Sequence, residues 1–135
     1  MYHFGVISGG IGGKGGTYER RLSSMESLSL KPGSGGRRSH AKWAMLAPME
    51  TQRSSHTVEH LNGIIYAVGG GDGKEWLSTA EAYDIGKNKW TRIANLKARR
   101  WKCGLVAVGD FLYAVGGMDS PKAGFWGDPL KSVER

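Results

Sequence analysis

An internal repeat constrains the fold of this chain more than any other feature of its sequence. The segment LNGIIYAVGG (61–70) returns as VGDFLYAVGG (108–117). The two copies are separated by about 47 residues, within the range of roughly 20 to 50 residues that marks repeat architectures. In such architectures one supersecondary unit is stacked several times along the chain. We therefore expect the fold to be a series of similar units.

Two further patterns extend the repeat. The same shift carries KWAMLAPM (42–49) onto KWTRIANL (89–96) and Arg53 onto Arg100. A pattern Leu-x-Ser/Thr-x-Glu occurs three times, as LSSME (22–26), LSTAE (77–81) and LKSVE (130–134). Three copies indicate three units, and FGVISGG (4–10) supplies the apolar strand with two glycines that the first unit needs.

The middle unit is predicted to form four short strands, because β-branched and aromatic residues cluster between turn signals. We expect these strands at residues 55–61, 64–68, 79–83 and 89–93, named a to d in this order. Asn62-Gly63 between the first two is a strong hairpin signal, and Gly86-Lys87-Asn88 has the same role between the last two. Four antiparallel strands per repeat of this length form one blade of a β-propeller.

The motif positions of this unit resemble those of the kelch family, in which strand b ends in two glycines, strand c contains Glu and Tyr-Asp, and strand d contains Trp. The matching residues are Gly69, Gly70, Glu81, Tyr83, Asp84 and Trp90. The first unit has Gly9, Gly10, Glu26 and Trp43, with Leu28 and Ser29 in place of Tyr-Asp, and the third has Gly116, Gly117 and Glu134. The resemblance implies an all-β fold, an incomplete kelch β-propeller with about two to three four-stranded antiparallel blades.

We expect the chain to divide at about residue 41. Residues 1–41 are glycine-rich and form a partial first blade with long loops. Residues 42–135 contain a d strand, one complete blade (53–96) and a partial blade (100–135). Since propellers need roughly four to eight blades, the end blades should expose apolar flanks that favour self-association.

The repeated residues are expected to have structural roles. The paired glycines let strand b turn where a Cβ would clash. Tyr83 and Trp90 should fill the wedge between blades, and Trp43 should do so one blade earlier. Glu26, Glu81 and Glu134 occur once per unit, which favours acceptance of backbone or arginine hydrogen bonds over catalysis.

The charge and the cysteine content restrict which classes of partner and which cellular compartment we expect for this chain. The formal charge is +7, but the basic residues are dispersed, so nucleic acid is not an expected partner. The single cysteine, Cys103, cannot form an internal disulfide, which favours a reducing compartment such as the cytoplasm. No apolar run approaches the roughly 18 residues of a membrane span, so neither membrane insertion nor secretion is expected.

Motifs that could support chemistry are weak. Residues 10–15 match G-x-G-x-x-G, the signature of a dinucleotide-binding turn, but this chain has no alternation of strands and helices. His56 and His60 have helical metal-ligand spacing yet fall in an expected strand. Cys103 is interpreted as a small buried apolar residue, with a reactive thiol as the alternative. We expect no catalytic set, no metal and no cofactor.

Binding is expected at the loops of one face, because loops on a rigid scaffold usually carry it. The candidate contacts are Arg53, Ser54, Ser55, Arg100 and Trp101, at the start of strand a in two units. Arginine beside hydroxyl groups suits the carboxylates or phosphates of an acidic or phosphorylated protein segment. The alternative is that both arginines bridge adjacent blades. Trp76, Phe125 and Trp126 are candidate exposed anchors, with packing over the apolar edge as the alternative.

The family resemblance implies a protein-interaction module and not an enzyme. Many kelch proteins act as substrate-recognition parts of adaptors of cullin-type ubiquitin ligases, and some bind actin or the cytoskeleton. Kelch propellers also occur in enzymes, a copper oxidase and a sugar mutarotase. The sequence has no recognisable ligand set for either enzyme, so we expect a ligase adaptor first and actin binding second.

Overall fold

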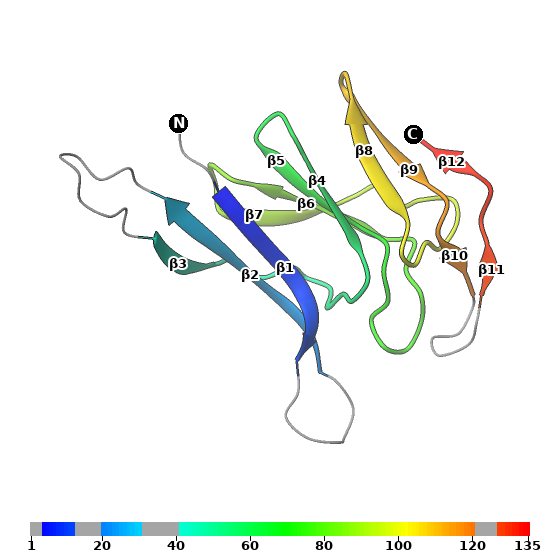
Figure 1. The fold of residues 1–135 in the computed structure, drawn as a ribbon, viewed down its shortest axis with the longest axis horizontal. Helices are drawn as coiled ribbons and strands as arrows, with labels where there is room; N and C mark the ends of the chain where they lie inside the picture. The colour runs from blue at the N-terminus through cyan, green and yellow to red at the C-terminus, as the bar shows by residue number, and fades with distance from the viewer. Residues whose placement is uncertain (1–3, 13–19, 31–40, 121–126) are drawn as a thin grey trace.

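The computed structural model describes residues 4–12, 20–30, 41–120 and 127–135, and these residues form strands, turns and loops without a helix (Figure 1). The strands are β1 (Phe4–Gly12), β2 (Arg20–Leu30), β3 (Ala41–Leu46), β4 (Thr57–Leu61), β5 (Ile64–Val68), β6 (Ala80–Asp84), β7 (Lys89–Ile93), β8 (Gly104–Val108), β9 (Phe111–Val115), β10 (Met118–Asp119), β11 (Asp128–Pro129) and β12 (Val133–Glu134). Within the described residues there is accordingly no helix that could cross a membrane.

Three sheets follow one another along the chain. The first has the order β1-β2-β3, the middle sheet β4-β5-β6-β7 and the third β12-β9-β8, and all pairs are antiparallel. Figure 1 shows them in this sequence, from the blue first sheet on the left to the yellow and red third sheet on the right. A ribbon of β10 and β11 extends the connection between β9 and β12. The all-β propeller-type fold expected from the repeat is therefore confirmed.

Turn residues determine the register of the middle sheet. Asn62 and Gly63 both have positive φ, 51° and 79°, as a two-residue type I′ hairpin requires. Asn88 has φ of 50° in the turn between β6 and β7. Tyr83 then pairs with Trp90 across these strands. All four strands lie within two residues of the positions predicted for them.

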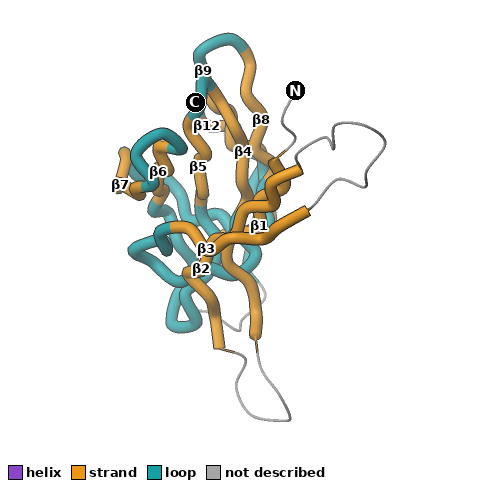
Figure 2. Tube along the Cα trace, turned by 90° about the vertical axis from the view of Figure 1, so that its left-hand side faces the viewer, coloured by secondary structure: helices purple, strands orange, loops and turns teal. Residues whose placement is uncertain are grey.

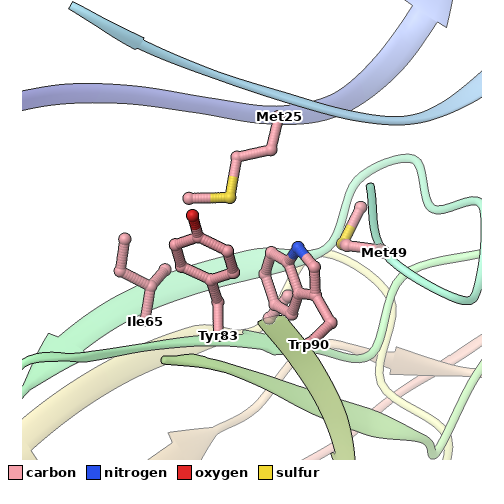
Figure 3. Close-up of a cluster of buried hydrophobic side chains, with 6 residues drawn as sticks. Met25, Met49, Ile65, Tyr83 and Trp90 are labelled. Carbon is pink, nitrogen blue, oxygen red and sulfur yellow. The ribbon is translucent and has the colours of Figure 1, made fainter. Parts of the chain in front are cut away.

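The interface between the first and middle sheets contains the core of the described chain, Met25, Met49, Ile65, Ala67, Tyr83 and Trp90 (Figure 3). The Tyr83 and Trp90 rings lie 5.2 Å apart at a tilt of 44°. The indole N–H of Trp90 donates to the carbonyl oxygen of Ala47 at 2.9 Å, and the hydroxyl of Tyr83 donates to Asn88 Oδ1 at 2.7 Å. Burying such a side chain stabilises the fold by roughly 1.5–3 kcal/mol.

Trp43 does not fill a wedge of this kind. Its side chain is 44% exposed, because it lies on the face of the first sheet that is turned away from the middle sheet. Met45 on the same strand is 65% exposed. The first sheet thus has one packed face, represented by Met25, and one open face, and the expectation for Trp43 is corrected accordingly.

The segment that follows the glycine motif is a strand, as the sequence predicted when it argued against a dinucleotide-binding turn. Such a turn needs a helix after the strand, whereas residues 20–30 form β2, antiparallel to β1. Residues 13–15 of the glycine motif lie outside the described residues. The segment LSSME is therefore a strand like its copy LSTAE, as the repeat requires.

Candidate partner-binding face

Arg53 precedes β4 and donates hydrogen bonds from all its side-chain N–H groups. Nε and Nη2 donate to Glu81 Oε1 at 3.2 and 2.9 Å. Nη1 donates to the carbonyl oxygens of Gly69 and Thr79, both at 2.9 Å, and Nη2 also donates to Thr79 Oγ1 at 2.9 Å. One guanidinium thereby ties the start of β4 to the end of β5 and to β6.

The carboxylate of Glu81 also accepts two backbone bonds. The N–H groups of Glu50 and Thr51 donate to Oε2 and Oε1 at 2.8 and 3.1 Å. Both residues lie in the connection that leads from β3 to β4. The Arg53–Glu81 pair therefore also fixes the chain that joins two sheets. This is the acceptor role expected of the repeated glutamates.

The third sheet reproduces this arrangement bond for bond. Nε and Nη2 of Arg100 donate to Glu134 Oε1 at 3.1 and 3.0 Å. Nη1 donates to the carbonyl oxygens of Gly116 and Ser132 at 2.6 and 3.1 Å, and Nη2 to Ser132 Oγ at 2.8 Å. The N–H groups of Lys97 and Ala98 donate to the same carboxylate. We call each arrangement an arginine clamp.

The clamps correct the expectation that Arg53 and Arg100 contact a partner. Both arginines are 0% exposed, and each uses its five N–H donors within the chain. A guanidinium without exposed surface cannot reach an external carboxylate or phosphate. The alternative, in which both arginines bridge adjacent blades, is corrected as well, because each arginine donates only to residues of its own unit and so holds the framework within that unit.

Burial and hydrogen bonding shift the pKa of clamp residues. Burial lowers the pKa of Arg53, and the hydrogen bond and charge of Glu81 oppose this shift. For Glu134 burial raises the pKa, but the hydrogen bonds from Lys97, Arg100 and Ala98 outweigh it, so the pKa is lowered. Glu134 is thus held in its charged form.

The residues two positions after the clamp arginines have unusual backbone conformations. Ser55 and Lys102 both lie in the left-handed region, with φ of 53° and 55°. The N–H of Lys102 donates to the carbonyl oxygen of Ser55 at 3.1 Å. A non-glycine residue in this region costs about 1–3 kcal/mol and persists where the surroundings fix it, often at functional sites. The same position is thus strained in two successive units.

Lys102 lies beside one of two stacked tryptophans. The rings of Trp76 and Trp101 stack at a centroid distance of 5.2 Å with an interplanar angle of 15°. Lys102 Nζ lies 4.4 Å from the centroid of the Trp101 ring. Trp101 is partly exposed, whereas Trp76 is only 6% exposed. Trp76 is therefore not an exposed anchor, and the alternative that it packs down onto the fold agrees with its stacking against Trp101. Phe125 and Trp126 lie outside the described residues.

These residues gather at one end of the sheets, which we call the loop end: residues 53–56, 69–79, 94–103, 118–120 and 127–129. It lies opposite the turn between β8 and β9, as Figures 1 and 2 show. Ser54 is buried there and pairs with Gly71 through both backbone groups. Arg99 and Glu75 form a more exposed ion pair at 3.8 Å. Of the five predicted contacts, Ser55 and Trp101 thus keep partly exposed surface, and Lys102 is the neighbour that the prediction missed.

The remaining candidates for chemistry are a reactive thiol at Cys103 and a metal site at the histidines, and both have weak support. Cys103 is half-buried, and burial raises the pKa of its thiol while the charge of Arg100 opposes this, so the thiol form is favoured. His60 Nε2 accepts the N–H of Gly63 at 3.2 Å. Across the described ranges no group of three or more His, Cys, Asp or Glu is placed to hold a metal ion.

Comparison with known proteins places this geometry in a family. The family model named Kelch motif matches residues 52–97. Kelch-like protein 13 of Mus musculus is 36% identical over 84 residues, which cover 58% of this chain and 13% of that protein. An F-box/kelch-repeat protein of Arabidopsis thaliana is 41% identical over 76 residues, covering 56% and 20%. The influenza virus NS1A-binding protein homolog of Xenopus laevis is 36% identical over 97 residues, covering 72% and 14%.

The chain spans about an eighth to a fifth of the length of these relatives. Among solved structures, YjhT matches with a TM-score of 0.60 and 17% identity, covering 72% of this chain and 29% of that one. At this identity the likeness shows the fold alone. Kelch repeats and kelch-like relatives together support a protein-interaction module. With its Kelch motif match and its kelch-like relatives, the chain belongs to the kelch-repeat family.

Proposed function

We propose that the loop end binds an acidic or phosphorylated segment of a partner protein, with Lys102 as the charged contact and the Trp101 ring as the apolar surface beside it. The observation that carries this proposal is the position of Lys102. Its backbone is held in the left-handed region by the bond to Ser55, and its ammonium group lies over the Trp101 ring. A fixed cation beside a partly exposed aromatic ring suits an anionic segment with an apolar neighbour.

The overall charge supports an anionic ligand. The chain has a formal charge of +7, which attracts anionic segments over a Debye length of roughly 8 Å in physiological salt. The clamps supply the rigid base, since each fixes the backbone immediately before Ser55 or Lys102. In this proposal the arginines position the contacts and do not touch the ligand.

Selection from a random peptide library displayed on phage tests this proposal. We expect peptides enriched in Asp and Glu, and we expect Lys102→Glu to weaken their binding about tenfold or more, because a charge-assisted bond of roughly 1.5–3 kcal/mol becomes a repulsion. Lys89→Glu is the matched control, since Lys89 is exposed at the opposite end of the middle sheet. Enrichment without acidic residues, or equal effects of the two variants, would contradict the proposal.

A narrower role follows from the family resemblance. We propose that the chain is the substrate-recognition part of a kelch-like adaptor of a cullin-type ubiquitin ligase and acts in the cytoplasm as a binding module without catalytic activity. The support is its identity to kelch-like proteins over 56–58% of its length. Co-precipitation of a cullin with the full-length gene product tests this role. Recovery of actin filaments without a cullin would instead favour the cytoskeletal alternative.

A further inference from the structure

The turn between β4 and β5 presents an asparagine that is followed directly by a glycine. Asn62 and Gly63 are both exposed, and Figure 1 shows this turn at the same end of the molecule as the turn between β8 and β9. Among the described residues, no hydrogen bond holds the side-chain amide of Asn62. A Cβ placed on Gly63 would meet no atom within 4 Å. The amide is therefore open to water and free to rotate beside the backbone nitrogen of Gly63.

His60 contacts that same backbone nitrogen. The N–H of Gly63 donates to His60 Nε2 at 3.2 Å. An imidazole nitrogen that accepts a hydrogen bond carries no proton of its own. The distance lies within the hydrogen-bond reach that a general base needs to the proton it removes. Residues 60–63 thus bring together a base, a backbone N–H and a side-chain amide.

We propose that Asn62 is a site of deamidation, in which His60 acts as the general base on the N–H of Gly63. The reaction uses only groups of this turn and water. The reacting nitrogen and the amide carbon belong to adjacent residues, so the step is intramolecular and needs no encounter. This site does not depend on the function proposed for the loop end.

The reaction proceeds through a cyclic succinimide. His60 Nε2 takes the proton of the Gly63 N–H, and the nitrogen attacks the side-chain carbonyl carbon of Asn62. A bond forms between these two atoms, and the bond from that carbon to the amide nitrogen breaks. The leaving nitrogen takes the proton back from His60 and departs as ammonia. Ring closure needs a rotation of the Asn62 backbone, which local opening at an exposed hairpin end permits.

Water then opens the ring at either of its carbonyl carbons, and the two products differ in their effect on the hairpin. Opening at one carbon gives aspartate, and Asp-Gly forms a type I′ turn as Asn-Gly does. Opening at the other gives isoaspartate, whose main chain runs through the side-chain carbon and is longer by one methylene group. This product should disturb the turn between β4 and β5. Both products add a negative charge there.

The chain contains two further asparagines, which serve as controls within the same molecule. The Oδ1 atom of Asn88 accepts hydrogen bonds from the N–H of Ala47 at 2.9 Å and from the hydroxyl of Tyr83 at 2.7 Å. Asn95 is followed by Leu96, whose side chain obstructs an attack by its nitrogen, whereas glycine has no side chain to do so. We expect both to deamidate far more slowly than Asn62.

Peptide mapping by mass spectrometry tests the proposal on the full chain, incubated at physiological temperature and pH in dilute buffer. The measured quantity is the rate at which Asn62 exchanges its amide NH2 for OH. His60→Gln should lower this rate about tenfold or more, because glutamine retains a hydrogen-bond acceptor but is not a base. Added imidazole should restore part of the lost rate in this variant, which a structural role of His60 would not explain.

Val58→Gln is the matched control, since Val58 is 41% exposed and lies two residues before His60 on β4. It should leave the rate at Asn62 unchanged, and circular dichroism checks that both variants keep the fold. A synthetic peptide EHLNGII, residues 59–65, sets the time scale of the reaction without the fold.

Two results would overturn the assignment. The first is a chain whose Asn62 stays intact while the peptide is fully deamidated, which would show that the folded turn protects the amide. The second is an equal rate in wild type and His60→Gln, which would show that His60 is not the base.

Discussion

At the scale of single residues, the arginine clamps hold the backbone segments of the loop end together. Each clamp ties three backbone segments through one planar group whose five N–H donors match the carboxylate and carbonyl oxygens around it. A lysine could not reproduce this fork. The charge of the arginine is compensated by a glutamate from the same unit, Glu81 or Glu134.

Arg53→Ala is expected to lower the free energy of unfolding by about 3–5 kcal/mol, because it leaves Glu81 charged, buried and without its counter-ion. Urea denaturation followed by circular dichroism measures this change. Arg99→Ala is the control, since the Arg99–Glu75 pair is 40% and 53% exposed and should contribute about 0–1 kcal/mol. Equal effects of the two substitutions would contradict a structural role of the clamp.

Acid is expected to weaken the clamp of the third sheet. The pKa of Glu134 is lower in the folded chain than its ordinary value of 4.5, so the folded state binds the proton less readily than the unfolded state. The stability from this shift is present above the unfolded pKa and is lost as the pH falls through the folded pKa. The difference in unfolding free energy between wild type and Glu134→Gln should therefore shrink from pH 7 to pH 3, and a constant difference would contradict this reasoning.

Which residues recur could be predicted at this scale, but not which ones are exposed. The repeat aligns Arg53 with Arg100, which indicates that the two arginines have the same role. A buried clamp and an exposed partner contact would both repeat in this way, so the repeat alone does not distinguish them. The repeated glutamates contained the missing signal, because each of these two units repeats an arginine before strand a together with a glutamate in strand c. Lys102 was missed because its repeat partner is Ser55, so no residue type recurs there.

At the scale of elements, paired glycines shape the end of strand b. Gly69 and Gly70 have φ of 67° and 86°, and a Cβ on Gly70 would lie 2.6 Å from the carbonyl oxygen of Ser54. A Cβ on Gly69 would clash with the carbonyl oxygen of Arg100. These glycines therefore permit the close approach between the end of β5 and the residues before β4 and β8.

Comparing Gly70→Ala with Gly63→Ala separates close approach from backbone strain. Gly63 has φ of 79° and open space around its Cβ position, so its substitution should cost only the strain of about 1–2 kcal/mol. Gly70→Ala should cost about 1–3 kcal/mol more, because the new methyl group overlaps Ser54 and His56. Thermal unfolding of the two variants provides the measurement, and equal losses would argue against the close approach.

Strands with a clear residue pattern and a recognisable turn could be predicted from the sequence. The two-residue strands β10 and β11 could not. The middle sheet follows from β-branched residues and from the Asn62-Gly63 turn, whose local chemistry fixes the register. β10 and β11 contain two residues each and include Asp128 and Pro129, which have low β-propensity. Their pairing depends on contacts in the loop end, which no local pattern encodes.

At the scale of the whole molecule, the two outermost sheets each have an exposed apolar face. The third sheet exposes Val106, Val108, Phe111, Val115 and Val133, and the first exposes Trp43 and Met45. Cross-strand pairing places Val108 opposite Phe111 and Val115 opposite Val133, so these four side chains lie in pairs on the sheet. Exposed apolar surface of this kind favours association.

The chain is therefore expected to self-associate at micromolar concentration. Val106→Lys with Phe111→Lys should shift it towards a monomer, since two charges would have to be buried in the contact. Size-exclusion chromatography with light scattering measures the mass, and Lys substitution at Ile85, outside the third sheet, serves as control. A wild-type chain that stays monomeric at high concentration would contradict this prediction.

The fold class was predictable because the repeat identifies equivalent strands independently of any single strand assignment. The position of Trp43 was not, because the repeat specifies which face of a sheet a side chain lies on but not whether another sheet covers that face.

The framework and the binding surface are separate in this chain, since the clamp arginines are buried and Lys102 is exposed. The most direct test measures unfolding free energy and affinity for a library-selected acidic peptide in two variants, Arg100→Ala and Lys102→Ala. We predict that Arg100→Ala loses about 3–5 kcal/mol of stability. Lys102→Ala should retain its stability and lose about tenfold or more in affinity. A Lys102→Ala chain that binds the peptide like wild type would contradict the account.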